Sequence, residues 1–491
     1  MEHQLLTQKK EIINLLLKQN IIVNAKILQE LNNQETIQKW HTELRKGTRF
    51  EDLIIKKETE NNQASNSEQT NDIEILFDYD KPNTKKTIQD FIDYFSKRYK
   101  QLSKLLQTRA ELQNLTSIAR IQGKQDRETI SIIAYVADKQ TTKNENIILT
   151  LEDETGRIKA LIGKTKEETY KQAKDLAVDE VIGIKGTTGN NIIFADTIIY
   201  PDIPVQTELK KAPEEVNVAI LSDLHYGSKL FLEEEFKKFI AWTQGKQGTK
   251  EQRDLAQKTK YIIIAGDLVD GVGVYPNQEE ELKIKDITKQ YEQIAQYLSL
   301  IPKDKTIIII PGNHDATRLS EPQPKLNKKF AKPIYELPNT INLSNPARIK
   351  INVKNVGFEF LIYHGYSYTY YGDKVESIRT SGKDLSARAD LIMKFLLQRR
   401  HLAPSHSSTL YLPDKEKDTL VIEKVPDFFI SGHMHKPTIS NYRGVSLISG
   451  SCWQSTTTFM EKMGIEADPA KVLIINLQTR NITIMNFSQN D

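Results

Sequence analysis

Residues 307–315 read IIIIPGNHD, and this stretch decides the fold because an unbroken apolar run ends directly in polar residues. A run without polar alternation is typical of a strand buried on both faces of a parallel sheet. Ligands of such sheets gather at the carboxyl ends of the strands. The sequence therefore predicts an α/β fold with Asn313, His314 and Asp315 at the functional edge of a sheet.

The same form, an apolar run followed by histidine, aspartate or glycine, recurs in other segments. They are Asp223-Leu224-His225 after residues 216–221, Gly266-Asp267 after 261–265, His364-Gly365 after 358–363, and Gly432-His433-Met434-His435 after 428–430. Because the carboxyl ends of parallel strands meet at one edge, these segments should converge on one crevice. The glycines suit a chain that turns sharply as it leaves a strand.

The side chains gathered in this way form a mixed oxygen and imidazole set, which suits divalent manganese, iron or zinc. The expected ligands are Asp223, His225, Asp267, Asn313, His364, His433 and His435. This set exceeds what one ion needs, whereas two ions about 3.5 to 4 Å apart that share a carboxylate would use all of it. The alternative for any single histidine is a hydrogen-bonded core residue, but the ordered recurrence of the pattern favours a metal site.

These motifs resemble those of the calcineurin-like metallophosphoesterases. The resemblance implies a β-sandwich flanked by helices that holds two divalent ions, with manganese favoured over iron and zinc. The residues implied for one ion are Asp223, His225, Asp267 and His435. Those implied for the other are Asp267, Asn313, His364 and His433, so that Asp267 bridges. His314 is then the residue that protonates the leaving oxygen or stabilises the phosphorane, and Asp315 the residue that orients His314.

The sequence between the metal motifs is more specific than the motifs, and over residues 115–491 it resembles the small subunit of archaeal family D DNA polymerase. The segments that carry the resemblance are 266–276 (GDLVDGVGVYP), 311–324, 400–404 (RHLAP), 426–435 (PDFFISGHMH) and 450–459 with Trp453 and Gln454. The resemblance implies a 3′–5′ exonuclease that acts on single-stranded or mispaired primer ends. It also implies a heterodimer with a large subunit that carries out polymerisation, and primer-template and single-stranded DNA as partners.

Two other functions remain open. One is a mainly structural subunit with a vestigial metal site, against which the complete ligand set argues. The other is a stand-alone repair nuclease or a protein phosphatase of the same superfamily. The strand-rich segment before residue 214 and the segment around Gln454 argue against it.

Hydrophobic spacing divides the upstream chain into further segments. Apolar residues at helical spacing predict a small helical module over residues 1–55, with a binding unit favoured over a dispensable extension. Residues 56–72 lack large apolar side chains and predict a flexible linker. Residues 73–128 are expected to form a helical connector, in which Thr87 and Asp90 begin an amphipathic helix.

Strand-like runs follow over residues 129–200, with a polar helix near 166–174 between the third and the fourth run. Three strands, a helix and two strands is the order of an OB-fold barrel. The runs carry few aromatic residues for stacking on single strands, so protein docking and DNA binding both remain open. A connector at 201–213 with several prolines leads into the phosphoesterase domain expected at 214–491.

The composition of the chain restricts its possible partners and its cellular compartment. The net charge is only +3, so a local basic surface would have to carry any binding to nucleic acid. A single cysteine, Cys452, excludes an internal disulfide framework and is typical of a reducing interior. The sequence shows neither a signal-peptide pattern nor an apolar run of membrane length, so we expect a cytoplasmic protein without a membrane partner.

Several residues near the motifs are further candidates. Tyr366 and Tyr368 are candidates for stacking on the terminal nucleotide, with packing in the loop as the alternative. Three arginines, Arg318, Arg399 and Arg400, are candidate contacts to DNA phosphates. The favoured alternative is that each is a solvated charge or a charge at an interface. His401 and His406 follow no strand-like run and are not expected to be ligands.

Overall fold

The computed structural model describes residues 8–9, 11–16, 34–46, 72–82, 84–122, 127–205, 209–462 and 466–488. The chain divides into two compact units, Met1–Asp72 and Ile73–Asp491. In the first unit, helix α3 (Gln34–Arg45) buries Ile37, Trp40 and Leu44, and the helical residues 11–16 bury Ile12 and Leu16. Helical structure is confirmed for these segments, whereas the linker predicted at 56–72 lies outside the described residues except for Asp72.

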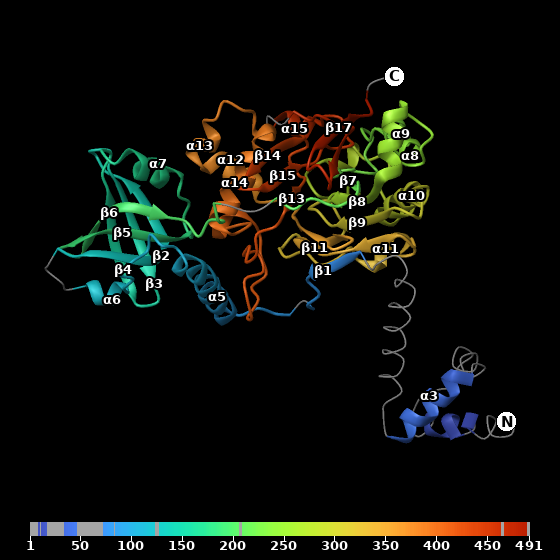
Figure 1. Ribbon diagram of the computed structural model, residues 1–491, viewed down its shortest axis with the longest axis horizontal. Helices are drawn as coiled ribbons and strands as arrows, with labels where there is room; N and C mark the ends of the chain where they lie inside the picture. Colours follow the sequence, from blue (N-terminus) through green and yellow to red (C-terminus); the bar gives the residue numbers. More distant parts are fainter. Residues whose placement is uncertain are drawn as a thin grey trace. The chain divides into compact units, whose positions relative to one another are not determined.

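Two six-stranded sheets organise most of the second unit (Figure 1). The first sheet has the order β10 (Thr340–Asn342), β9 (Thr306–Ile310), β8 (Thr259–Ala265), β7 (Asn217–Leu221), β16 (Lys471–Asn476) and β17 (Ile482–Asn486). The second has the order β1 (Ile73–Phe77), β11 (Ala347–Val353), β12 (Val356–Ile362), β13 (Phe428–Ser431), β15 (Val445–Ser449) and β14 (Thr438–Tyr442). The strands predicted before the metal motifs are thus confirmed as β7, β8, β9, β12 and β13.

Apolar side chains from both sheets pack against each other in one buried cluster. Ile220, Ile263 and Ile308 of the first sheet belong to the same cluster as Phe360 and Ile430 of the second, and all are fully buried. This explains why the strands are apolar at consecutive positions, because a strand in this arrangement is covered on both faces. The parallel pairs β7–β8, β8–β9 and β12–β13 bring their carboxyl ends to the same edge.

Helices cover the outer face of each sheet. Those that pack near the first sheet are α8 (Glu233–Thr243), α9 (Lys250–Lys258), α10 (Ile287–Ser299) and α11 (Lys328–Tyr335). Those near the second are α12 (Tyr368–Lys374), α13 (Glu376–Arg379) and α14 (Ala389–Arg399). Shorter segments are α6 (Ile118–Ile121), α15 (Thr458–Lys462) and the 3-10 turns η1 (Gln278–Glu280), η2 (Leu385–Arg388) and η3 (His406–Ser408). The described residues contain no helix that could cross a membrane.

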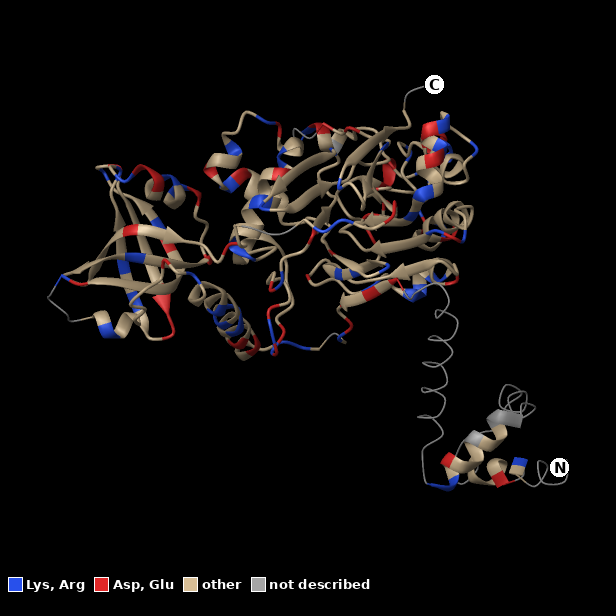
Figure 2. Ribbon diagram, in the orientation of Figure 1, with Lys and Arg blue, Asp and Glu red and all other residues tan. Residues whose placement is uncertain are grey.

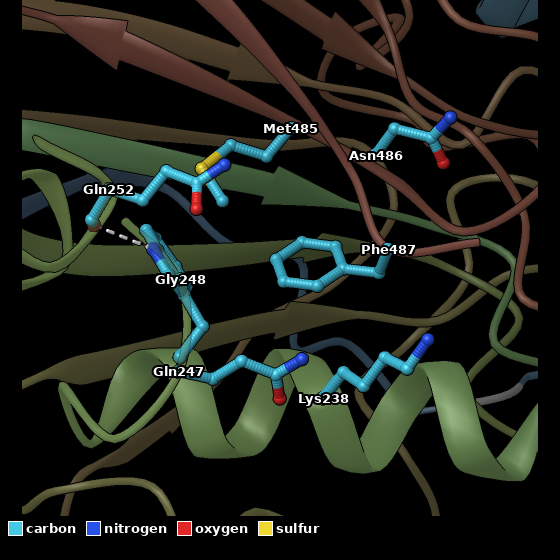
Figure 3. A pocket seen from close by; sticks show the side chains of 8 residues that line it. Lys238, Gln247, Gly248, Gln252, Met485, Asn486 and Phe487 are labelled. Carbon is cyan, nitrogen blue, oxygen red and sulfur yellow. Dashed lines mark hydrogen bonds between the residues drawn. The ribbon is translucent and has the colours of Figure 1, made fainter. Parts of the chain in front are cut away.

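A small hollow at the end of the first sheet belongs to this packing. Trp242 of α8 donates a hydrogen bond from Nε1 to the Gln252 carbonyl at 2.8 Å, and Met485 and Phe487 lie beside it (Figure 3). The hollow measures about 20 Å³. Since a cavity needs about 10 to 15 Å³ for one water molecule, this one has no room for a larger ligand.

A closed five-stranded barrel follows β1 and precedes the other strands of the two sheets in the chain. Its strands are β2 (Thr129–Thr141), β3 (Ile147–Asp153), β4 (Gly156–Ile162), β5 (Val181–Gly189) and β6 (Ile192–Ile199), in the order β2-β3-β4-β6-β5. Helix α7 (Glu167–Asp175) lies between β4 and β5 in the chain, as predicted. Lysine and arginine are interspersed with acidic residues over the barrel and the sheets (Figure 2), in line with the small net charge.

The prediction that residues 73–128 are a helical connector is wrong for the first of them. Residues Ile73–Phe77 form β1, which pairs antiparallel with β11 at the edge of the second sheet. The segment IEILF is too short for a periodicity to stand out, and its partner lies far away in the sequence. The rest is largely helical, since α5 (Ile88–Gln107) begins at Thr87, whose amide donates a hydrogen bond to Asp90 Oδ2 at 2.6 Å.

A buried polar network joins α5 to the segment between α14 and β13. Asp418 Oδ2 accepts hydrogen bonds from Arg98 Nε at 2.6 Å and from His401 Nε2 at 2.8 Å, and Asp418 Oδ1 accepts one from the Tyr94 hydroxyl at 2.8 Å. Burial and the charge of Arg98 lower the pKa of His401 to about 4, so its ring is neutral. Although burial raises the pKa of Asp418, Arg98 and His401 hold it well below its usual range. His401 therefore has a packing role in this network.

The barrel is held to the sheets by Arg399, which is only 4% exposed. Its guanidinium donates to Glu180 Oε2 at 3.2 Å and lies over the rings of Phe395 and Tyr200. The neighbouring Arg400 donates to the carbonyls of Ile422 and Glu423. Both arginines are buried, so their candidacy as DNA-phosphate contacts was wrong. Arg399 has the interface role, whereas Arg400 holds the segment before β13.

Candidate metal centre

The predicted ligands lie in loops that leave the carboxyl ends of β7, β8, β9, β12 and β13. The backbone is left-handed at most of them, with φ values of 52° at Asp223, 51° at His225, 51° at Asp267, 67° at His433 and 57° at His435. Non-glycine residues rarely adopt this region, and such strain clusters at functional sites. The turns aim side chains from both sheets at one point.

Two glycines allow the loops to approach each other closely. A Cβ atom on Gly266, where φ is 92°, would lie 2.2 Å from His364 Nδ1. A Cβ atom on Gly312 would lie 2.2 Å from Asp267 Oδ1. Any side chain at either position would push apart the residues that the site brings together.

One cluster contains Asp223, His225 and His435, each with a potential ligand atom within 4.8 Å of the others. His225 Nε2 lies 3.1 Å from His435 Nε2, and His435 Nε2 lies 3.4 Å from Asp223 Oδ1. The second nitrogen of His225, Nδ1, donates to Asp270 Oδ1 at 3.1 Å. That bond leaves the Nε2 lone pair of His225 facing the cluster.

The other cluster contains Asp267, His364 and His433. His364 Nε2 lies 3.3 Å from Asp267 Oδ2 and 2.9 Å from Asn313 Oδ1, while Nδ1 of the same ring donates to the Ala265 carbonyl at 2.9 Å. Asp267 Oδ2 also lies 3.8 Å from His225 Nε2 of the first cluster. Asp267 therefore stands between the two clusters.

The surroundings of two buried imidazoles, His433 and His364, are compatible with a cation at the centre. Burial, reinforced by the charge of His364, lowers the pKa of His433 to about 3, so this ring is neutral and keeps a lone pair. Burial also acts to lower the pKa of His364, but Asp267 and Asp223 outweigh it and raise the value to about 9. The carboxylates thus favour positive charge where His364 faces Asp267 and Asn313. The donor set is compatible with divalent metal ions.

His314 borders the centre at its rim. Its amide donates to Asp267 Oδ1 at 2.8 Å, and its ring Nδ1 donates to the Asp270 carbonyl at 2.8 Å. The side chain is 15% exposed, and it is also grouped with His225 and Asp267 as a potential ligand. Because Nδ1 carries the proton of that hydrogen bond, Nε2 is the atom that can exchange a proton with a substrate.

Comparison with known proteins identifies the family. Residues 218–440 match the DNA polymerase alpha/epsilon B-subunit family. The DNA polymerase II small subunit of Methanothermobacter thermautotrophicus is 38% identical over 406 residues, which are 82% of this chain and 81% of that protein. The chain belongs to the archaeal DNA polymerase II small subunits. The resemblance seen in the sequence is thereby confirmed.

Other small subunits extend beyond the shared region. Those of Pyrococcus furiosus and Methanocaldococcus jannaschii are 38% and 40% identical over 82% and 80% of this chain, but the match spans only 64% of each of them. Among solved structures, an archaeal phosphodiesterase is covered over 99% of its length by 55% of this chain. Its identity of 14% and TM-score of 0.26 are too low to bear on function.

The expectation that Asp315 orients His314 is wrong for this small subunit. Asp315 Oδ1 accepts from the Tyr291 hydroxyl, and Oδ2 accepts from the amides of Leu268 and Gly312. Its carboxylate therefore fixes the loops after β8 and β9 to each other, while Asp270 holds the ring of His314. Burial and Asp267 raise the pKa of Asp315 to about 6.

Asp270 is a site residue that the sequence interpretation missed. It accepts from His225 through its carboxylate and from His314 through its carbonyl, and it is 1% exposed. Gln454 Nε2 lies 3.3 Å from its Oδ1. A second aspartate three residues after the ligand Asp267 was the available signal, because a carboxylate behind a ligand histidine fixes the ring.

The candidate DNA contacts differ in their surroundings. Tyr368 is fully buried in the second-sheet cluster, so the proposal that it stacks on a nucleotide was wrong. Tyr366 is half-buried and its ring lies 5.7 Å from that of His433, at the edge of the centre. Arg318 donates to the carbonyls of Ser320 and Pro322 and lies over the Tyr79 ring.

Replacing Glu321 with glutamine is expected to stabilise the small subunit at alkaline pH. Glu321 is fully buried beside the Tyr363 hydroxyl, and burial raises its pKa from 4.5 to about 7. A raised acid pKa means that the folded state binds the proton more tightly, so the stability from this group is present below pH 4.5 and is lost as the pH rises through 7. Glu321→Gln should therefore gain about 1 to 3 kcal/mol over the wild type at pH 8.

Calorimetric melting at pH 5 and pH 8 measures this gain. The exposed Glu461→Gln is the matched control and should change little at either pH. A difference between Glu321→Gln and the wild type that stays the same at both pH values would contradict the assignment of a raised pKa.

Proposed function

We propose that this chain is the proofreading subunit of a heteromeric archaeal DNA polymerase, a two-metal 3′–5′ exonuclease that acts on single-stranded or mismatched DNA ends. The observation that carries the proposal is the complete ligand set around Asp267, which faces both His364 and His225. A subunit kept only for assembly would not need this cluster of buried carboxylates and imidazoles, since taking charged groups out of water costs free energy even when they are paired.

The proposal includes the architecture implied by the motifs. Residues 214–491 are a calcineurin-like metallophosphoesterase domain, residues 129–200 an OB-fold domain, and residues 201–213 their connector. The helical residues 11–16 and α3 belong to the N-terminal module proposed over residues 1–55, and residues 73–128 are a connector whose first residues join the sheet as β1. The linker proposed at 56–72 lies outside the described residues except for Asp72. The chain forms a heterodimer with the large polymerising subunit in the cytoplasm, where it meets primer-template DNA.

The proposal gives each residue at the centre a role. Asp223, His225, Asp267 and His435 would hold one divalent ion, and Asp267, Asn313, His364 and His433 the other, with manganese favoured over iron or zinc. Two such ions, when bound, supply the charge that polarises a phosphodiester and makes water nucleophilic at neutral pH. Asp270 holds the ring of His225 so that Nε2 faces Asp223 and His435, where it could bind an ion. His314 donates a proton from Nε2 to the departing 3′ oxygen.

Release of nucleotides from a mismatched primer end tests this function. The chain is coexpressed with the large subunit, and the complex is assayed with Mn²⁺ on a primer whose 3′ nucleotide is mispaired. His314→Asn is expected to slow release by about 10²- to 10⁴-fold, the usual contribution of a general acid. Metal content, measured on the same sample, should persist.

His406→Asn is the matched control, because His406 is exposed and contacts Tyr411 away from the centre. It should leave the rate unchanged. The wild-type complex is also assayed with Fe²⁺ and with Zn²⁺. If it releases no nucleotide with Mn²⁺, Fe²⁺ or Zn²⁺, the nuclease is rejected and the structural role remains. Equal rates for His314→Asn and the wild type would reject the role of His314.

A further inference from the structure

A groove of about 750 Å³ opens beside His314 and leads away from the candidate metal centre. The loops 271–274 and 313–319, which follow β8 and β9, form two of its walls, and Ile287 and Phe330 line it from α10 and α11. The groove thus shares His314 and Asn313 with the centre. Its volume lies within the range of about 300 to 1,000 Å³ that is usual for small-molecule sites.

The walls expose apolar side chains. Val272 is 46% exposed, Val274 36% and Leu319 41%. An exposed apolar patch with a polar rim marks a contact surface for a ligand or partner. The groove lies directly beside a centre proposed to cleave DNA. The apolar surface of a DNA substrate is the face of an unpaired base, so we expect a base to contact these side chains.

The basic side chains of the same walls are already engaged. Lys325 Nζ lies 2.6 Å from Asp78 Oδ2, and Arg318 Nη2 donates to the Pro322 carbonyl at 2.6 Å. The groove therefore offers more to bases and sugars than to phosphates. Binding of this kind should depend only weakly on salt, because salt dependence comes from phosphate contacts.

The position of His314 indicates which part of the DNA strand would lie in the groove. In 3′–5′ hydrolysis, the water oxygen bonds to phosphorus and the bond from phosphorus to the 3′ oxygen of the penultimate nucleotide breaks. The proton from His314 Nε2 goes to that oxygen, which stays on the retained strand. The proton that the water loses passes to solvent, and the terminal nucleotide leaves as a 5′-monophosphate. The retained strand must therefore lie on the side of His314, which is the side of the groove.

We propose that this groove binds the penultimate nucleotide of the retained strand through apolar contact of its base with Val274 and Leu319. The inference rests on the proposed function and names the substrate of the same site: a 3′ end whose last nucleotides are unpaired. A paired base cannot reach these side chains while it remains in the duplex. The groove therefore selects frayed or mismatched ends over paired ones.

The test uses the complex with the large subunit and the double variant Val274→Ser/Leu319→Ser. The matched control is Val205→Ser/Leu300→Ser, since these two side chains are 70% and 54% exposed and lie outside the groove lining. The substrates are single-stranded DNA with all its bases, the same strand with an abasic penultimate residue, and the same strand with an abasic terminal residue. Hydrolysis of bis(p-nitrophenyl) phosphate reports the metal centre alone.

The groove variant is expected to lose about 5- to 100-fold in kcat/KM on the intact strand, the range of one lost base contact. It should lose little on the strand with the abasic penultimate residue, which already lacks that contact. It should lose as much on the strand with the abasic terminal residue as on the intact strand. Hydrolysis of the small diester, and all rates of the control variant, should stay at the wild-type level.

Other results overturn the inference. An equal loss on the strand with the abasic penultimate residue, or on the small diester, means that the groove does not read this base. A loss that disappears only with the abasic terminal residue means that the groove holds the released nucleotide. Loss of copurification with the large subunit marks a protein docking surface instead. If the wild-type complex cleaves the small diester but no DNA, the proposed function fails and the inference with it.

Discussion

Replacement of Asp267 by asparagine is expected to lower the rate of the proposed exonuclease reaction by roughly a thousandfold or more. Asp267 Oδ2 faces His364 Nε2 at 3.3 Å and His225 Nε2 at 3.8 Å, so one carboxylate serves both clusters. The neutral amide of the asparagine would carry no charge, so both clusters would lose the negative charge that they share. A loss of several kcal/mol in transition-state stabilisation corresponds to at least a thousandfold in rate, since each 1.36 kcal/mol is a factor of ten.

Asparagine keeps the fold intact, so the loss can be attributed to the centre. The Oδ1 atom of Asp267 accepts from the His314 amide at 2.8 Å, and an asparagine oxygen can accept the same bond. Single-turnover release of the 3′ nucleotide and metal analysis of the purified complex measure the effect. The matched control is Asp304→Asn, an exposed aspartate 3.2 Å from Lys260 Nζ. A near-normal rate for Asp267→Asn with bound metal would remove this residue from the mechanism.

Replacement of Asp418 by alanine is expected to destabilise the second unit by about 3 to 5 kcal/mol. Asp418 is 1% exposed and neutralises Arg98, which is equally buried. Removing the carboxylate leaves an uncompensated guanidinium in the interior, together with the unpaired groups of His401 and Tyr94. The cost comes from the buried charge that remains rather than from the bond that is lost.

A double replacement separates these two contributions. Arg98→Met/Asp418→Leu removes both charges and should be much less destabilising than Asp418→Ala, because apolar pairs replace buried ion pairs at small cost. Calorimetric melting of the three proteins measures the difference, with exposed Asp304→Ala as the control. Equal losses for the single and the double variant would contradict the argument.

The parts of the fold that the sequence revealed are those with local patterns. The strands β7, β8 and β9 are covered on both faces, so their apolar runs stand out, and the polar residues after them mark the edge of the sheet. The succession of three strands, a helix and two strands along the barrel segment was also visible, since each strand differs in composition from its turns. The candidate metal ligands could be predicted because they stand next to these strands in the chain.

The features that the sequence did not predict depend on contacts between residues distant in the sequence or on the geometry of loops. Tyr368 lies four residues after His364, but α12 begins there and turns its ring into the core. Asp315 is adjacent to His314, yet its carboxylate points to Tyr291 of α10. Asp270 reaches the centre only because the loop after β8 folds back over it. No spacing rule gives the direction of a side chain in such a loop.

During translation, strand β1 is made long before β11, the strand with which it pairs. Residues Ile73–Phe77 leave the ribosome about 270 positions before β11, the strand that completes their hydrogen bonds. At about 5 to 20 residues per second, the apolar segment IEILF waits on the order of 15 to 55 s for that partner. During this interval an unpaired strand is a template for the wrong neighbour. Chaperone demand during translation should therefore fall when this short strand is deleted, even though the finished sheet loses an edge.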